Sequence, residues 1–175
     1  MKRSQLEHVL RAEAAIAQET TVVVVDSQAI LMAFPHAPDE LLVSREIDVC
    51  PVLHPEKSDL IEGAIGAVSS FEQTFGYYAD GVGPETAVMS NNWRTRGKLY
   101  YIGEVTVICP EVHDLAVSKC VAGRDKGADF IRALFRHSTI ELPVMMEPIG
   151  LLESTKHLVQ HITQSTQRRA QEATE

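Results

Sequence analysis

The stretch TTVVVVDSQAIL, residues 20–31, joins two different local patterns with no loop between them. Its β-branched half, residues 20–25, predicts a strand that is buried on both faces. Asp26 and Ser27 follow at once, and both residue types commonly cap the first turn of a helix, so a helix is expected to begin there. Pro35 would end this helix, because its ring does not fit a helix interior. The stretch therefore predicts a strand that turns directly into a helix.

Patterns on both sides of this stretch predict further helices and strands. Ser4 and Glu7 have the spacing of a capping box, which indicates a helix at the start of the chain. Up to residue 110 the residue pattern predicts strands at 41–43 and 47–49, a helix over 55–67, a strand region over 71–82, and a hairpin of 99–102 with 105–109. Beyond residue 110, apolar spacing predicts helices at about 110–122 and 126–136, and one or two more over 142–152 and 156–162. We therefore expect an α+β fold with a mixed sheet and a helical last third.

Length and composition limit the classes of protein that need consideration. The chain has 175 residues, 45% of them hydrophobic, and its 16 Lys and Arg against 24 Asp and Glu residues give a net charge of −8. This length suits one domain. We expect it to span residues 1–162, sheet-rich over 1–109 and helical over 110–162, with a fraying helix end or a disordered tail at 163–175. The charge excludes a generally basic surface for nucleic acid.

Other sequence features concern where the protein resides. No apolar run approaches the roughly 18 residues that a membrane span needs, and no apolar signal-peptide segment follows the basic start of the chain. The three cysteines, Cys50, Cys109 and Cys120, are too few and too far apart for a disulfide scaffold or a Cys-x-x-Cys zinc site. The simplest expectation is a cytoplasmic protein with no membrane partner.

Glu46-x-Asp48 is the first candidate for a metal site. Residues two apart on a strand project from the same face, so these carboxylates can hold Mg²⁺, a cation that prefers oxygen ligands. The alternative is an ordinary solvated strand face. Ser27, at the predicted strand-to-helix turn, could help to bind phosphate at a helix N-terminus, or could simply cap the helix.

Three other sets of polar residues also have two interpretations. Lys119, in the segment HDLAVSK at 113–119, could neutralise a triphosphate or could belong to an exposed, ion-paired helix. The aromatic and basic cluster at 93–98 could contact a nucleic-acid backbone or could be a solvated loop. His157 and His161 are one helical turn apart and could bind a metal, but a solvated helix face is favoured because no third ligand lies nearby in the sequence.

Several short motifs occur together in this chain, in an order that resembles a known family. They are SQAIL at 27–31, EID at 46–48, FGYYA at 75–79, GVGPETA at 81–87, HDLAVSK at 113–119 and AGR at 122–124. Together they resemble the small bacterial nucleotidyltransferases of the AbiEii-like abortive-infection toxin type. The resemblance covers nearly the whole chain, to about residue 134.

The resemblance implies a nucleotidyltransferase-like mixed sheet flanked by helices, and a role for each matching residue. In this family a serine in the first turn, here Ser27, binds the phosphates of an NTP. An acid-x-acid strand, here Glu46 and Asp48, binds Mg²⁺. Lys119 matches the lysine that neutralises the triphosphate, and Asp129 matches the late aspartate that completes the site.

The implied reaction moves a nucleoside monophosphate from an NTP to a hydroxyl of an RNA, such as a tRNA, or of a protein. The family also implies a toxin role in a toxin–antitoxin system, with an antitoxin protein as partner. Two departures motivate an alternative, a weakened or inactive binding module of the same fold. Asp26 stands where the family turn has glycine, and Gly127 stands where an aspartate is expected. A further alternative is a homo-oligomeric scaffold that uses the C-terminal helices.

Overall fold

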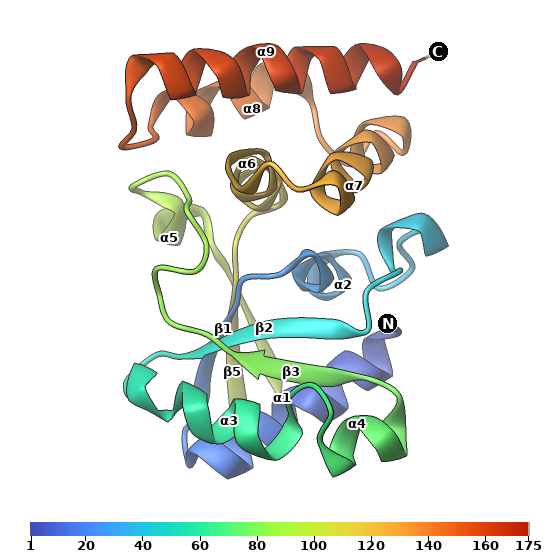
Figure 1. The fold of residues 1–175 in the computed structure, drawn as a ribbon, viewed down its shortest axis with the longest axis vertical. Helices are drawn as coiled ribbons and strands as arrows, with labels where there is room; N and C mark the ends of the chain where they lie inside the picture. The colour runs from blue at the N-terminus through green and yellow to red at the C-terminus, as the bar shows by residue number, and fades with distance from the viewer. Residues whose placement is uncertain (175) are drawn as a thin grey trace. The chain divides into compact units, whose positions relative to one another are not determined.

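The computed structural model describes residues 1–174, and the chain divides into two compact units (Figure 1). The first, which we call the sheet unit, contains Met1–Thr86 and Lys98–Cys109. The second, the helical unit, contains Ala87–Gly97 and the chain from Pro110 onward. The chain therefore enters the helical unit at residue 87, returns to the sheet unit for one hairpin, and enters the helical unit again at residue 110.

Within residues 1–174, one mixed, open sheet of five strands organises the sheet unit, which confirms the predicted sheet type. Its order is β3-β2-β1-β5-β4, so the first strand along the chain is the central one. β1 runs antiparallel to β2 and parallel to β5, β2 and β3 are parallel, and β4 and β5 form an antiparallel hairpin. The strands span Thr21–Val24 (β1), Glu46–Pro51 (β2), Tyr78–Gly81 (β3), Lys98–Ile102 (β4) and Val105–Cys109 (β5).

Helices cover both faces of this sheet. Figure 1 shows α1, α3 and α4 on one side of the sheet and α2 on the other. Ile47, Val49 and Val107 are fully buried in the core, as expected for β-branched residues of central strands. The helical segments span Arg3–Ala17 (α1), Ser27–Ala29 (η1), Ile30–Ala33 (α2), Asp39–Leu41 (η2), Pro55–Lys57 (η3), Ser58–Ile65 (α3) and Ser70–Phe75 (α4).

The helical unit packs its helices around a second apolar core. A buried polar network fixes the 87–97 segment to α6: Arg96 donates to both carboxylate oxygens of Asp114 at 2.8 and 2.6 Å, and Ser90 Oγ donates to Asp114 Oδ1 at 2.7 Å. The helices span Trp93–Arg96 (α5), Val112–Ala122 (α6), Asp125–Arg136 (α7), Leu142–Gly150 (α8) and Lys156–Glu172 (α9). No helix within residues 1–174 has both the length and the apolar character that crossing a membrane requires.

The α+β class and the helical last third are confirmed, but two strand predictions are wrong. Residues 41–43 do not form a strand, since Leu41 ends the short helix η2 and β2 begins only at Glu46. Residues 71–75 belong to α4, not to a strand. Ser69 caps that helix, because its Oγ accepts a hydrogen bond from Glu72 N at 3.2 Å. The cap outweighs the strand preference of the aromatic residues.

Residues 163–172, for which we expected a fraying helix end or a disordered tail, continue α9 to Glu172. Thr166 is 0% exposed and Arg169 is 8% exposed, so this segment packs against the rest of the helical unit. Arg132 of α7 also donates to Glu172 at 2.6 Å. Tertiary contacts of polar residues, which composition does not reveal, hold this part of α9.

Candidate metal centre

Alternation along β2 separates its acidic residues from its apolar ones. Ile47 and Val49 are 0% exposed and face the core, whereas Glu46 and Asp48 are half-buried on the opposite face. The two carboxylates therefore project from one side of the strand, as the sequence predicted. Cys50, the next residue on that side, is buried.

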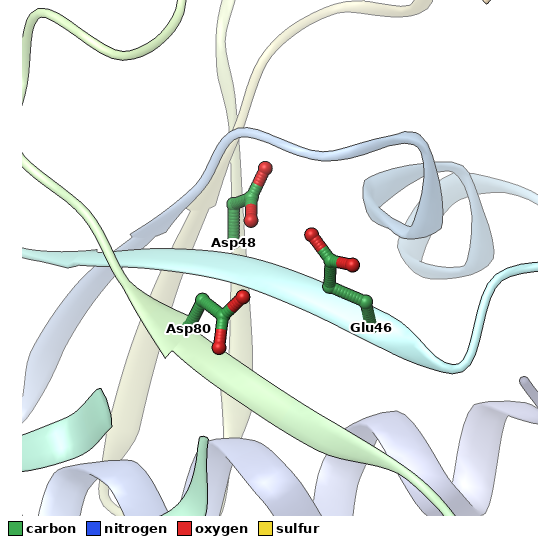
Figure 2. A group of neighbouring side chains, drawn as sticks. All are labelled: Glu46, Asp48 and Asp80. Atoms are coloured by element: carbon green, nitrogen blue, oxygen red, sulfur yellow. The ribbon is translucent and has the colours of Figure 1, made fainter. Parts of the chain in front are cut away.

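β3 adds a third carboxylate beside this pair. β3 runs parallel to β2 in a register that sets Asp80 opposite Asp48 and Tyr78 opposite Glu46. Residues opposite one another in a sheet project to the same face, so Asp80 lies on the side of Glu46 and Asp48. Figure 2 shows the three side chains together over the two strands.

The three residues are close enough together that they could hold a divalent cation. Each offers one carboxylate oxygen, and these three oxygens all lie within 4.8 Å of one another. Oxygens on opposite sides of one Mg²⁺, each about 2.1 Å from the ion, would be about 4.2 Å apart. Among three oxygens on one octahedral ion, at most one pair is opposite and the other pairs are about 3 Å apart, so the carboxylates would draw closer together on binding a cation. Three carboxylates also repel one another, and a bound cation would relieve that repulsion.

Tyr78 fixes the orientation of Glu46. Its hydroxyl donates a hydrogen bond to Glu46 Oε2 at 2.9 Å. Burial, this hydrogen bond and the nearby charges of Glu46, Asp80 and Glu72 raise the pKa of Tyr78 to about 12. The phenol therefore keeps its proton at neutral pH and remains a donor. It leaves the other oxygen of Glu46 available to a cation.

The carboxyl group of Asp80 has a raised pKa. Burial and then the charge of Glu46 raise it, with smaller contributions from Glu62 and Glu72, while a hydrogen bond from Ala67 N at 3.4 Å acts in the opposite direction. The Ala67 contact also places Asp80 beside a surface hollow of about 500 Å³. That hollow is lined by residues of α3 and of the following loop: Asp59, Glu62, Gly63, Ala67, Val68 and Ser69.

The turn that contains Ser27 begins next to Asp48. Val25, the first residue after β1, donates its backbone N–H to Asp48 O at 3.1 Å, and Asp26 and Ser27 come directly after it. Asp26 is 8% exposed, and its carboxylate accepts a hydrogen bond from Ser27 Oγ at 3.2 Å. The serine is therefore in the same unit as the three acids, with its hydroxyl directed to Asp26.

Lys119 and Asp129 belong to the helical unit, on α6 and α7. The carboxylate of Asp129 is 79% exposed and pairs with Arg132 at 2.9 Å. Gly127 has a packing role: a Cβ at this position would lie 3.3 Å from Lys119 O, tighter than ordinary contact. Glycine at 127 thus lets α7 approach α6 at Lys119. Helix packing alone therefore explains the glycine at position 127, with no catalytic role required.

Asp80 and Tyr78 were not among the site residues predicted from the sequence, which matched Asp129 to the family's late aspartate and left the third carboxylate open. The segment YADG at 78–81 contains a local signal for Asp80. Its alanine, Ala79, is buried, so the neighbouring Asp80 projects to the opposite face of the strand. Comparison of the chain with protein-family models, with curated proteins and with solved structures found no match. The geometry of these residues therefore carries the functional argument.

Proposed function

We propose that this protein is a Mg²⁺-dependent nucleotidyltransferase. It would transfer a nucleoside monophosphate from an NTP to a hydroxyl of an RNA, such as a tRNA, or of a protein, with release of pyrophosphate. The observation that carries the proposal is the group of three carboxylates, Glu46, Asp48 and Asp80, on two adjacent parallel strands. The order of the motifs along the chain is its second support.

Each residue of the sheet unit has a defined part in this proposal. Glu46, Asp48 and Asp80 hold the cation, and Tyr78 keeps the Glu46 carboxylate in place through its 2.9 Å hydrogen bond. Bound Mg²⁺ would neutralise phosphate charge and activate the attacking oxygen. Ser27 binds the β- and γ-phosphates, which requires its hydroxyl to turn away from Asp26.

The remaining parts of the proposal come from the resemblance alone. Lys119 neutralises charge on the triphosphate, and Asp129 supports a second metal or orients Lys119. The activity serves as the toxin of a toxin–antitoxin system in a cytoplasm, and an antitoxin protein binds and inhibits it. The cysteines Cys50, Cys109 and Cys120 are buried thiols, which is compatible with a reducing compartment.

Asp26 favours a second candidate, a binding module of the same fold without catalysis. Its buried carboxylate lies at the turn where the phosphates would bind, and it already occupies the hydroxyl of Ser27. A negative charge in that position repels a triphosphate. In this alternative the protein binds a partner or a metal but transfers nothing.

The deciding experiment is incubation with Mg²⁺, labelled NTPs and a total tRNA pool, with Asp48→Asn and Asp80→Asn beside the wild type. Asp39→Asn is the matched control, because Asp39 is an exposed acid of the same unit outside the cluster. The enzyme proposal expects label transfer by the wild type and the control and none by the two cluster variants. Label transfer that persists in Asp48→Asn would exclude Asp48 as a metal ligand. Cation binding by the wild type with no label transfer by any of the four proteins would favour the binding module.

A further inference from the structure

Two glutamates lie buried at the end of α1, away from the candidate metal centre. Glu13 is on the core-facing side of α1, together with Leu10 and Ala17, and is 1% exposed. Glu19 is 7% exposed and follows the end of the helix, where its backbone N–H donates to Ala14 O at 3.1 Å. An acid at a core position of an amphipathic helix is a departure from the usual pattern.

Most of the carboxylate oxygens of this pair have no hydrogen-bond partner. Within residues 1–174, both oxygens of Glu13 and Oε1 of Glu19 are buried without a partner. Glu19 Oε2 accepts one hydrogen bond, from Leu53 N at 3.3 Å. An ionised carboxylate that is buried without a partner is strongly unfavourable, and two such groups close together are more so. The protonated form of Glu13 removes this difficulty, since it is neutral and carries no charge into the core.

The charged groups around α1 offer no neutralising partner to Glu13. α2 and β1 carry no ionisable side chain, and Asp59 and Glu62 of α3 are exposed acids. Tyr78 and Asp80 of β3 lie on the sheet face of the metal centre. The Cys109 thiol of β5 stays neutral, because burial raises its pKa to about 12.

The cations of this region contact groups other than Glu13. Lys57 of η3 donates its Nζ to Ala17 O at 2.6 Å. On α1 itself, Arg3 and Arg11 pair with Glu7 at 2.9 and 3.3 Å. Burial and then the charge of Glu19 raise the pKa of Glu13 to about 8. The direction of this shift agrees with the missing partners.

We propose that Glu13 and Glu19 form a proton-binding site that holds one proton at neutral pH and releases it in mildly alkaline solution. Glu19 accepts a hydrogen bond from Leu53 N, so the pair lies where the end of α1 meets the segment after β2. Loss of the proton leaves two buried negative charges at this junction. The sheet unit is then less stable, because both glutamates are buried.

The test compares the pH dependence of unfolding in the full-length wild type and in Glu13→Gln, which keeps the shape but cannot ionise. A group with a raised pKa in the folded state contributes its stabilisation at low pH and loses it as pH rises. The unfolding constant of the wild type, relative to that of Glu13→Gln, should increase about tenfold per pH unit between about pH 5 and pH 8. Glu7→Gln, on the same helix but ion-paired with Arg3 and Arg11, should show no such relative change.

A direct titration covers the case in which Glu13→Gln fails to fold. Carbon NMR of the glutamate carboxyl groups in the wild type should show one group titrating in the neutral to alkaline range, and Glu19→Gln should move that titration to lower pH. Titration of every glutamate near the ordinary value would overturn the proposal. So would stabilisation of the alkaline wild type by millimolar Mg²⁺ that Glu13→Gln abolishes, since the pair would then bind a metal cation and not a proton.

Discussion

Asp48 and Asp80 lie directly opposite one another on the parallel strands β2 and β3. This single register brings an acid from each strand to one face of the sheet, and Glu46 completes the group from two residues away on β2. A shift of β3 by one residue would replace Asp80 by Ala79 or Gly81 on this face. The candidate metal centre is therefore a property of strand pairing as much as of the acidic motif.

Asp80→Asn tests whether the third acid is a ligand or only a neighbour. Without a cation, the variant should be slightly more stable than the wild type, because burial and the charge of Glu46 disfavour the ionised form of Asp80, as its raised pKa indicates. With Mg²⁺, the wild type should gain stability and the variant should not. Thermal unfolding with and without Mg²⁺ measures both effects. Equal stabilisation of the two proteins by Mg²⁺ would remove Asp80 from the site.

Tyr78→Phe tests the hydrogen bond that orients Glu46. The ring remains, so the fold should persist, but Glu46 Oε2 loses its 2.9 Å donor. Loss of such a supporting contact typically weakens metal binding by about 10- to 100-fold, and we expect an effect near the lower limit, about tenfold, because Glu46 itself remains. Calorimetric titration with Mn²⁺ as the probe would measure it. Tyr101→Phe is the control, since Tyr101 is 71% exposed on β4, and unchanged affinity in Tyr78→Phe would assign Tyr78 a packing role alone.

The shared face of Glu46 and Asp48 could be predicted from the sequence because alternation along one strand is a local property. Glu46 and Asp48 share a face wherever β2 lies in the sheet. Asp80 could not be assigned in the same way, because its place depends on the pairing of β2 with a strand of only four residues that follows a helix. The aromatic residues before it favoured one long strand, whereas the Ser69 cap and Gly76 at φ 76° confine α4 between them.

The same limit applies to the buried glutamates. The apolar spacing of α1 predicted the helix, but Glu13 occupies a core position that a periodicity argument assigns to an apolar residue. Only tertiary packing shows that both of its oxygens lack partners. Residues that depart from the local sequence pattern in this way are expected at functional or strained sites.

Val68→Gly tests backbone strain in the loop beside Asp80. Val68 has φ 66°, a left-handed conformation that is unfavourable for a β-branched residue, and its side chain gains nothing by burial because it is 81% exposed. Left-handed backbone costs a residue with a Cβ about 1–2 kcal/mol, and glycine loses about 0.5–1 kcal/mol through its greater freedom when unfolded. The variant should therefore be more stable by about 0.5–1 kcal/mol in urea unfolding.

Val43→Gly is the matched control for this change. Val43 is 82% exposed, and its φ is not in the left-handed region. Glycine there brings only the entropic penalty, so this variant should be less stable than the wild type by about 0.5–1 kcal/mol. If both substitutions lower stability equally, the conformation of Val68 carries no strain.

Asp26→Gly and Asp26→Asn separate the catalytic proposal from the binding module. Both changes remove the negative charge at the turn next to β2, and glycine also frees the Ser27 hydroxyl from its 3.2 Å hydrogen bond. If the turn binds phosphate, NTP affinity in the presence of Mg²⁺ should rise in both variants, and more in glycine, because repulsion is removed and donors become available. Binding of a labelled NTP, measured as the salt concentration is varied, reports the affinity and its electrostatic part.

Asparagine is the more informative of the two variants. It keeps nearly the shape of aspartate and can still accept a hydrogen bond from Ser27, so it changes charge while leaving the local conformation intact. Asp26 has an extended backbone, φ −95° and ψ 169°, which asparagine adopts as readily as aspartate. An increase in NTP affinity with asparagine therefore reports the charge alone. A loss of NTP affinity in both variants would instead mean that the carboxylate of Asp26 takes part in binding. Asp26 would then be a functional residue of this site and would no longer argue for an inactive protein.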